Sequence, residues 1–367
     1  MGQKRRFNEL DALRGVAALI IAFTWHYQHF TPLSNAPFYS AISGLYNYGY
    51  LAVELFFWIS GFVMMHAYGQ KIIKNEISFV DYMIRRLKHL YPLMFVTLIV
   101  VAAGQIYNLK TTGTFFVYGG TDLFHFTMNL LCIQTGFFDP FFSFNGPAWC
   151  MSVELVCYAL LYFILRVSKG DSCKKYCYLA GTAAVALAVV ASQVNKPIIN
   201  EQMARGVGSF FVGTICYAIY NYVKRIGKER RLGLISLAFE GVVIMIGLSC
   251  REFNMFDNIK LLMVLGIVPA LIFTCTNLKV VSKVLSIPPL VYLGKISLSV
   301  YMWHFPIQML IDIANRNMGM TLDYGSAKVW FLYIGIVLMT AVLSYELFEK
   351  RLCGSLLGNR CKKGETK

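Results

Sequence analysis

The chain has few charged side chains for its length. Of its 367 residues, 14% are Asp, Glu, Lys or Arg, only 19 are acidic, and 57% are hydrophobic. Soluble globular domains carry about 25% charged residues. The shortage of charge excludes an ordinary soluble domain and indicates a polytopic membrane protein.

The sequence also lacks paired cysteine motifs and a signal-peptide cleavage site. The ten cysteines form no CxxC pair and no even-numbered group within one loop, so we expect them to be small packing residues. The basic start and the apolar run behind it lack a small-residue cleavage site, so we expect a retained membrane anchor. No low-complexity tract, repeat or soluble domain is evident, so we expect one integral-membrane domain over residues 1–350 and a short basic cytoplasmic tail over 351–367.

Long apolar runs occupy most of the chain. A window of about 19 residues, the length that crosses a bilayer, predicts ten transmembrane helices. They cover residues 12–30, 48–68, 91–107, 150–167, 176–194, 206–223, 232–250, 258–277, 290–313 and 328–348. A shorter apolar stretch at 123–138 contains several polar residues, and we expect it to be re-entrant or interfacial. The expected fold class is an all-α polytopic membrane protein.

The basic residues lie mainly on one side of the predicted spans. The net charge is +15, and 27 of the 34 Lys and Arg residues fall on that side. They lie within residues 4–14, 71–88, 166–175, 224–231, 279–295 and 350–367. This alternation follows the positive-inside rule and predicts an even number of spans, both termini cytoplasmic, in the cell (cytoplasmic) membrane. The basic surplus thus reflects topology and attraction to anionic lipid, and we expect no nucleic-acid partner.

The first predicted span contains ionisable residues. Asp11 and Arg14 stand three residues apart on one helix face, where they can pair at the cytoplasmic interface. His26 lies about two-thirds of the way across, where an ionisable side chain costs roughly 2.5–3.5 kcal/mol. A neutral histidine there could accept a proton from a hydroxyl. The alternative is a histidine hydrogen-bonded to a neighbouring helix, and His29, nearer the interface, is a weaker candidate.

Two carboxylates lie near the outer ends of other predicted spans. Glu54 could orient or charge-balance His26, as a carboxylate does for a catalytic imidazole, or it could be an interfacial carboxylate that faces water. Next to it in the sequence, Ser60 and Gly61 permit close helix approach. Glu154 sits one turn inside the fourth span, where it could face the same cavity as His26.

Further candidates flank these residues. Ser152 could cap the fourth span, which begins beside Trp149. Tyr301 and His304 share one face of the ninth span, and Pro306 frees a backbone carbonyl two turns into it. A helix-packing role for His304 and a catalytic one remain equally open.

A basic cluster precedes the third span. Arg86 and His89 share one helix face, as do Arg85 and Lys88, and proline follows at position 92, which fits the start of a span. Such a cluster would hold the phosphates of a nucleotide-bearing donor. The alternative is that these residues only set the topology.

Together these segments resemble the acyltransferase-3 family of integral-membrane O-acyltransferases, over nearly the whole chain. The motifs that carry the resemblance are LDALRG at 10–15 with His26, VELFFWISGF at 53–62, the basic run into Tyr91-Pro92, PAWCMSVE at 147–154, LGKISLSVYMWHFP at 293–306 and SYELFEK at 344–350. One such motif would mean little, but six in order across ten predicted spans are a specific signal.

The resemblance implies an activity and a set of roles. Members of the family move an acyl group, usually acetyl from acetyl-CoA, across the membrane to a hydroxyl, often on a cell-envelope sugar. By the resemblance His26 is the catalytic base, Arg14 and Arg86 belong to the donor-binding set, and Glu154 lies in the active cavity. The expected partners are acyl-CoA, a carbohydrate or lipid-linked sugar acceptor and the bilayer, and no metal is expected.

Two positions depart from the family pattern. Eleven residues separate Arg14 from His26, one more than usual, which turns the side chain by about 100° on a regular helix. We therefore expect a π-bulge to restore its direction. The second departure is His89, which stands where the family usually has a second arginine.

A rival interpretation is a proton-coupled transporter or flippase that uses the intramembrane His and Glu residues as a proton relay. The sequence lacks the paired repeat and the matched Gly/Pro-broken helices that many transporters show. A third possibility, a lipid-binding scaffold, leaves the buried charges unexplained.

Overall fold

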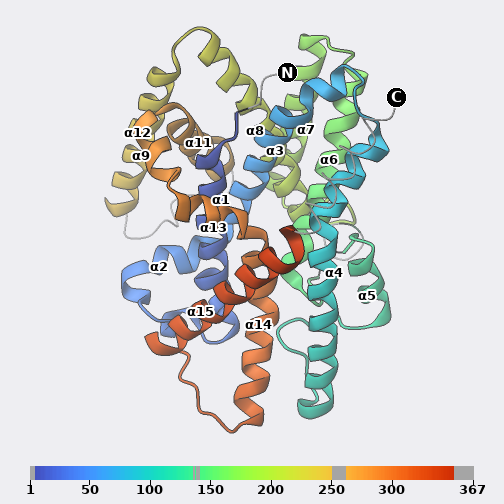
Figure 1. Ribbon diagram of the computed structural model, residues 1–367, viewed down its shortest axis with the longest axis vertical. Coiled ribbons are helices and arrows are strands. Elements are labelled where there is room, and N and C mark those ends of the chain that lie inside the picture. Colours follow the sequence, from blue (N-terminus) through green and yellow to red (C-terminus); the bar gives the residue numbers. More distant parts are fainter. Residues whose placement is uncertain (1–4, 135–136, 138–140, 250–261, 351–367) are drawn as a thin grey trace. The chain divides into compact units, whose positions relative to one another are not determined.

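The computed structural model describes residues 5–134, 137, 141–249 and 262–350, and within these ranges the regular elements are all helical (Figure 1). The contacts divide the chain into two compact units that alternate along the sequence. The first unit comprises residues 1–17, 51–79 and 156–295, and the second comprises 18–50, 80–155 and 296–367. The expected single membrane domain over 1–350 stays a prediction, and the tail at 351–367 lies outside the described residues.

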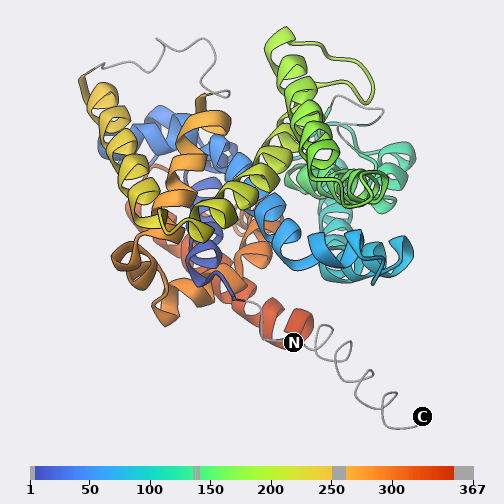
Figure 2. The same ribbon diagram turned by 90° about the horizontal axis from the view of Figure 1, so that it is seen from above.

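The first unit is built around a closely packed helix pair. Its helices are α3 (Ala52–Ile73), α7 (Ser172–Ser192), α8 (Glu201–Arg225), α9 (Glu229–Ser249), α11 (Val268–Asn277), α12 (Lys279–Leu285) and α13 (Pro288–Lys295), with a π-helix at Met263–Ile267. Figures 1 and 2 show α3 alongside α8, and α7 also packs against α8. A Cβ on Gly61 would overlap the carbonyl oxygen of Phe210, and one on Gly213 would overlap that of Trp58. The close approach predicted at Gly61 is confirmed.

A second glycine contact joins two of the sequence motifs. Gly15 of α1 (Asn8–Phe23) lies against Leu293 and the backbone of Gly294, and a Cβ on Gly294 would in turn overlap the Asp11 carbonyl. These glycines therefore let α1 and α13 touch backbone to backbone.

The second unit carries the histidines. Its elements are a 3₁₀ helix at Trp25–His29, α2 (Tyr39–Tyr48), α4 (Phe79–Thr112), α5 (Leu123–Leu130), α14 (Ser297–Asn317), α15 (Ala327–Ser344) and a π-helix at Tyr345–Glu349. The α6 helix (Trp149–Val167) begins in this unit and ends in the first. The α4 helix begins at Phe79 and continues through Pro92, so Pro92 lies inside a longer helix, and the start of the membrane span there stays a prediction.

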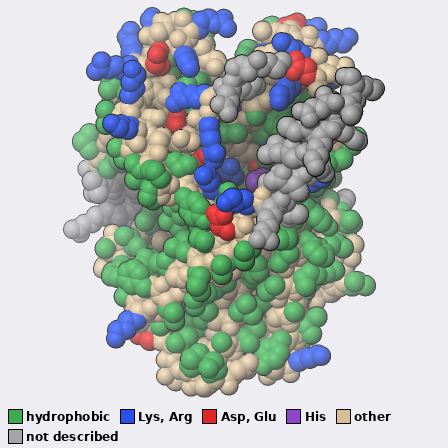
Figure 3. Space-filling model, viewed as in Figure 1, with side chains coloured by type: hydrophobic (Ala, Val, Ile, Leu, Met, Phe, Trp, Pro, Cys, Tyr) green, Lys and Arg blue, Asp and Glu red, His purple; other side chains and the backbone are tan. Residues whose placement is uncertain are grey.

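Five described helical segments are long and apolar enough to cross a membrane. They are Tyr39–Ile73, Phe79–Thr112, Gly146–Val167, Ser172–Ser192 and Ala327–Glu349. The pair Leu265–Asn277 and Lys279–Leu285, bent by 93°, would make a sixth if it is one span. Many of the side chains on the face in Figure 3 are hydrophobic. The exposed hydrophobic residues of the described chain include Phe124, Val185 and Phe331. These features are those of a multi-pass membrane protein.

The count of ten spans and the cytoplasmic termini stay predictions. Helix α1 has 16 residues, or about 24 Å, which is less than the ~30 Å of a bilayer core. Helix α5 is an eight-residue helix capped by Asp122, too short for a span. Residue 250 and residues 258–261 of two predicted spans lie outside the described residues, as do 135–136 and 138 of the predicted re-entrant segment.

Candidate functional site

The first helix stops before it reaches the histidine. Helix α1 ends at Phe23, and the chain continues as a 3₁₀ helix over Trp25–His29. The expected π-bulge between Arg14 and His26 is therefore wrong, because the chain winds more tightly here and not more loosely. A 3₁₀ helix eclipses side chains three residues apart, so His26 stacks on His29, with 5.0 Å between ring centroids and 18° between ring planes.

Side chains from the C-terminal helices stabilise this break. The last carbonyls of an α-helix have no partner within the helix. The Tyr333 hydroxyl donates to the carbonyl of Ala22 at 3.1 Å, and the Trp330 indole donates to that of Phe23 at 2.9 Å. The Thr24 hydroxyl donates to the carbonyls of both Ile20 and Leu45. Side-chain donors thus satisfy the backbone carbonyls at the end of α1, just before His26.

A chain of hydrogen bonds fixes the protonation state of His26. His304 is fully buried, and its Nδ1 lies 2.6 Å from the carbonyl of Tyr301, which can only accept. The hydrogen of His304 therefore sits on Nδ1, and its Nε2 is an acceptor. Nδ1 of His26 lies 2.7 Å from that Nε2 and must donate to it. Nε2 of His26 is left with a free lone pair and no partner in the part of the chain that the structure describes.

The second histidine is held in the same way. The fully buried Gln308 donates from Nε2 to the His26 carbonyl at 2.9 Å, which fixes the orientation of its amide. Its Oε1, 3.0 Å from Nδ1 of His29, must then accept from that nitrogen. Nε2 of His29 is therefore also an acceptor. Both residues are half-buried.

Aromatic rings border the histidines. Tyr118 and Phe305 meet His29 edge to face, at centroid distances of 5.9 and 5.6 Å, and they contact each other at 5.1 Å. A Cβ on Gly146 would meet the Tyr118 ring, and its hydroxyl at 3.0 Å, so glycine leaves the space that this ring fills. The site therefore has polar nitrogens on one side and aromatic faces beside them.

The turn before α6 is tied to α14. Asn145 donates to the carbonyl of Met302 at 3.2 Å, and the Tyr301 hydroxyl donates to that of Pro147 at 2.9 Å. Met302 stands four residues before Pro306, which has no N–H to offer that carbonyl. The prediction that Pro306 frees a carbonyl is confirmed, and Asn145 is the residue that satisfies it.

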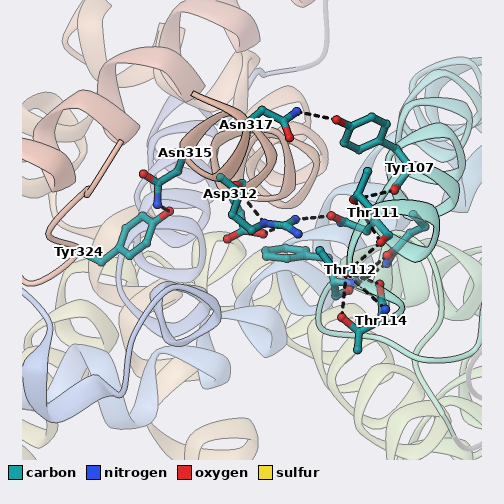
Figure 4. A network of polar contacts seen from close by, with 12 residues as sticks. Tyr107, Thr111, Thr112, Thr114, Asp312, Asn315, Asn317 and Tyr324 are labelled. Carbon is teal, nitrogen blue, oxygen red and sulfur yellow. Dashed lines mark hydrogen bonds and ion pairs between the residues drawn. The ribbon is translucent and has the colours of Figure 1, made fainter. Parts of the chain in front are cut away.

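The far end of α14 is anchored to α4. Figure 4 shows Asn317 donating to the Tyr107 hydroxyl at 2.7 Å, beside Asp312 and its neighbours. Arg316 pairs with Asp312 at 2.8 Å and also donates to Asn108. His304, Gln308, Asp312 and Arg316 follow at intervals of four residues along one face of α14. That face is therefore polar from the histidine pair to the end of the helix.

The remaining predicted residues lie in several places. On α6, Trp149 and Ser152 are buried and Glu154 is half-buried, all in the same unit as His26. Ser152 is part of α6 itself and not its N-cap. Their roles stay predictions.

Two predicted charges have other partners. The buried Glu54 accepts from Arg205 at 2.5 Å within the first unit. Asp11 pairs with Arg6 at 2.8 Å, and the expected pairing with Arg14 is not among the ion pairs of the described residues. A role for Glu54 beside His26 stays a prediction.

The basic cluster proves to be helical. Arg85 and Arg86 are half-buried and Lys88 and His89 are exposed, all on α4. The cluster lies within a helix, as the shared helix faces predict, and its place between two spans and its donor-binding role stay predictions.

Gln308 was missed by sequence reasoning as part of the site, and His29 was named only as a weaker candidate than His26. The signal was present in the spacing, because His29 follows His26 by three residues and Gln308 follows His304 by four. Reading it required knowing that the chain around His26 is a 3₁₀ helix. Among the described residues, no three His, Cys, Asp or Glu side chains are placed to hold a metal ion.

Comparison with known proteins places the chain in a protein family. A family model described as an acyltransferase domain matches residues 7–348. The chain is 24% identical over 374 positions to the acyltransferase MdmB of Streptomyces mycarofaciens. The matched region covers 97% of this chain and 92% of that protein. No solved structure matches the chain.

Two further relatives are matched over about half their own length. Protein 2 in the picA locus of Rhizobium radiobacter is 40% identical over 100 residues, 27% of this chain and 45% of that protein. A Bacillus subtilis (strain 168) protein, provisionally named peptidoglycan O-acetyltransferase YrhL, is 23% identical over 343 residues. The matched region covers 83% of this chain and 50% of that protein.

Proposed function

Because the chain belongs to the acyltransferase-3 family, we propose that it moves an acetyl group from cytoplasmic acetyl-CoA to a hydroxyl of a carbohydrate or lipid-linked sugar of the cell envelope. The observation that carries the proposal is His26, whose Nδ1 is tied to His304 and whose Nε2 is free. A positioned base of this kind contributes roughly 10²–10⁴-fold to a proton transfer.

In the proposed reaction one nitrogen, Nε2 of His26, both takes up the proton and gives it back. Nε2 of His26 takes the proton of the acceptor hydroxyl while the oxygen forms a bond to the thioester carbonyl carbon. The carbon–sulfur bond then breaks, and the CoA thiolate takes the proton from His26. Transient transfer of the acyl group to the imidazole is the alternative order. In either order the His304–Tyr301 chain supports the positive charge that develops on His26.

The donor is proposed to be held by the predicted basic set. Arg85, Arg86, Lys88 and His89 lie within five residues of one helix, and guanidinium groups bind phosphate oxygens in pairs. Arg14 belongs to the same set by its place in the LDALRG motif. We also propose that Glu154 supports the imidazolium from α6, beside Trp149 and Ser152.

Thiol release from acetyl-CoA tests the proposal. Purified protein in lipid nanodiscs is offered envelope sugars, and His26→Ala is compared with the wild type and with His125→Ala, a histidine paired with Asp122 on α5. We expect release that needs the acceptor, falls about 10²-fold or more in His26→Ala and persists in His125→Ala. Folded wild-type protein that releases no thiol with any acceptor would favour the transporter interpretation.

A further inference from the structure

We infer that His29 and His26 together form a subsite for two adjacent hydroxyl groups, so that the acceptor is a vicinal diol. The inference rests on the proposed function, because it names the class of acceptor that the same site would take. It goes beyond the family resemblance, which points to His26 and is silent on His29.

The first observation is that the two free nitrogens lie on the same side. Nδ1 of His26 is held by His304, and Nδ1 of His29 is held by Gln308. His304 and Gln308 stand four residues apart, hence on one face of α14. Both Nδ1 atoms therefore point toward that face, and both Nε2 atoms, across their rings, point away from it.

The second observation is the spacing of the rings. The imidazoles are nearly parallel, with 18° between planes and 5.0 Å between centroids. A hydroxyl that donates to each nitrogen at about 2.6–3.2 Å would leave the two oxygens close to each other. Oxygens on adjacent carbons of a sugar or polyol satisfy this spacing, whereas a lone hydroxyl meets only one nitrogen.

The third observation is what surrounds the pair. Tyr118 and Phe305 present aromatic surface beside His29, and Gln308 is fully buried behind it. Binding sites for small molecules commonly combine apolar walls with a few placed polar groups. The hydroxyl that meets His26 would lose its proton and be acylated, and its neighbour would donate to His29 and fix the orientation of the acceptor.

A missing hydroxyl should be costly at such a site. A pocket built to hydrogen-bond a substrate hydroxyl discriminates strongly against an analogue that lacks it, because a polar group of the protein is left unpaired. We therefore expect acyl transfer to a vicinal diol to exceed transfer to the matching mono-alcohol by roughly 10- to 100-fold, beyond the factor that two equivalent hydroxyls supply.

The test uses ethylene glycol and ethanol, which are the smallest such pair and can enter the site whatever the size of the natural acceptor. Acetyl transfer from acetyl-CoA is measured for the purified full chain at equal alcohol concentration. His29→Asn keeps a donor for Gln308 near the position of Nδ1 but loses the outer acceptor, and His29→Gln places an amide oxygen near the position of Nε2.

We expect the wild type to prefer ethylene glycol, His29→Asn to lose the preference and His29→Gln to retain part of it. Transfer to both alcohols without a preference, or a preference that survives in His29→Asn, would overturn the inference while leaving the acyltransferase intact. Wild-type protein that acylates neither alcohol nor any envelope sugar would instead contradict the proposed function, and the inference would fail with it.

A chemical measurement checks the geometry without turnover. Diethyl pyrocarbonate modifies unprotonated, accessible imidazole nitrogens, and peptide mass spectrometry locates the product. We expect modification of His26 and His29, protection of the buried His304, and slower modification of His29 in the presence of ethylene glycol than of ethanol. Modification of His26 and the exposed His89 without His29 would overturn the inference.

Discussion

At the scale of single residues, the candidate base depends on a backbone carbonyl. The Tyr301 carbonyl fixes the hydrogen of His304, and His304 in turn fixes that of His26. In the proposed reaction His304 would take the role that a buried carboxylate plays in a hydrolase triad, without adding a formal charge to the site. By this proposal His304 is a positioning residue, because it would reach the reacting atoms only through His26.

His304 variants should separate positioning from folding. In His304→Gln an amide oxygen near the position of Nε2 can still accept from His26, whereas His304→Leu leaves Nδ1 of His26 unpaired. We expect kcat to fall by about 10²-fold in His304→Leu and by less in His304→Gln, with little change in KM for acetyl-CoA. A KM effect without a kcat effect would contradict the assignment.

Asn145 offers a test of the carbonyl that Pro306 frees. Asn145→Ala leaves the buried Met302 carbonyl without its donor, which costs about 1–3 kcal/mol. Pro306→Ala restores an N–H four residues along the helix, so the double variant should lose less stability than the sum of the two single variants. Thermal unfolding in detergent measures the cycle, and strict additivity would show that the two residues do not share this carbonyl.

At the scale of elements, glycines set how closely the helices pack. Gly61 and Gly213 bring α3 and α8 together, and Gly15 and Gly294 do the same for α1 and α13. In a bilayer, helix association relies on such close packing because lipid tails remove the usual hydrophobic driving force.

Gly61→Ala should therefore destabilise the first unit. The added methyl group overlaps the Phe210 carbonyl, and backbone cannot move aside as a flexible side chain can. We expect a loss of about 1–3 kcal/mol, seen as a lower midpoint of thermal unfolding. Gly241→Ala on α9 is the matched control, since nothing lies within 4 Å of its added methyl group and alanine favours the helix. Equal midpoints for the two variants would refute the packing argument.

The sequence was informative where an element is decided locally. Apolar runs located most of the long helices. The structural roles of Gly61 and Pro306 could be predicted because a missing side chain and a missing N–H act at the residue itself. The predicted span begins at residue 91 whereas α4 begins at Phe79, because a hydropathy window leaves out the polar first turns around Arg85 and Arg86. The end of α1 was misplaced because its free carbonyls are met by Trp330 and Tyr333, whose positions no local pattern reveals.

At the scale of the whole molecule, the distribution of basic residues predicts sidedness. Segment 71–88 should face the cytoplasm, and the connection between α14 and α15 should face the other side. In a cysteine-free background, Thr321→Cys should react with a membrane-impermeant maleimide in intact cells, and Glu76→Cys only after permeabilisation. Both positions are exposed in the structure. The reverse pattern would invert the topology and with it the side from which donor and acceptor enter.

The long separation between the histidine and its partners also bears on how the protein is made. His26 precedes His304 by 278 residues, and Phe23 precedes Trp330 by 307. At translation rates of 5–20 residues per second, roughly 14 to 56 s pass between synthesis of the two histidines. During that interval the nascent chain holds His26 without the partner that orients it, and a chain that terminates before His304 never acquires that partner. The oriented arrangement of His26 thus forms only once the last helices have been synthesised.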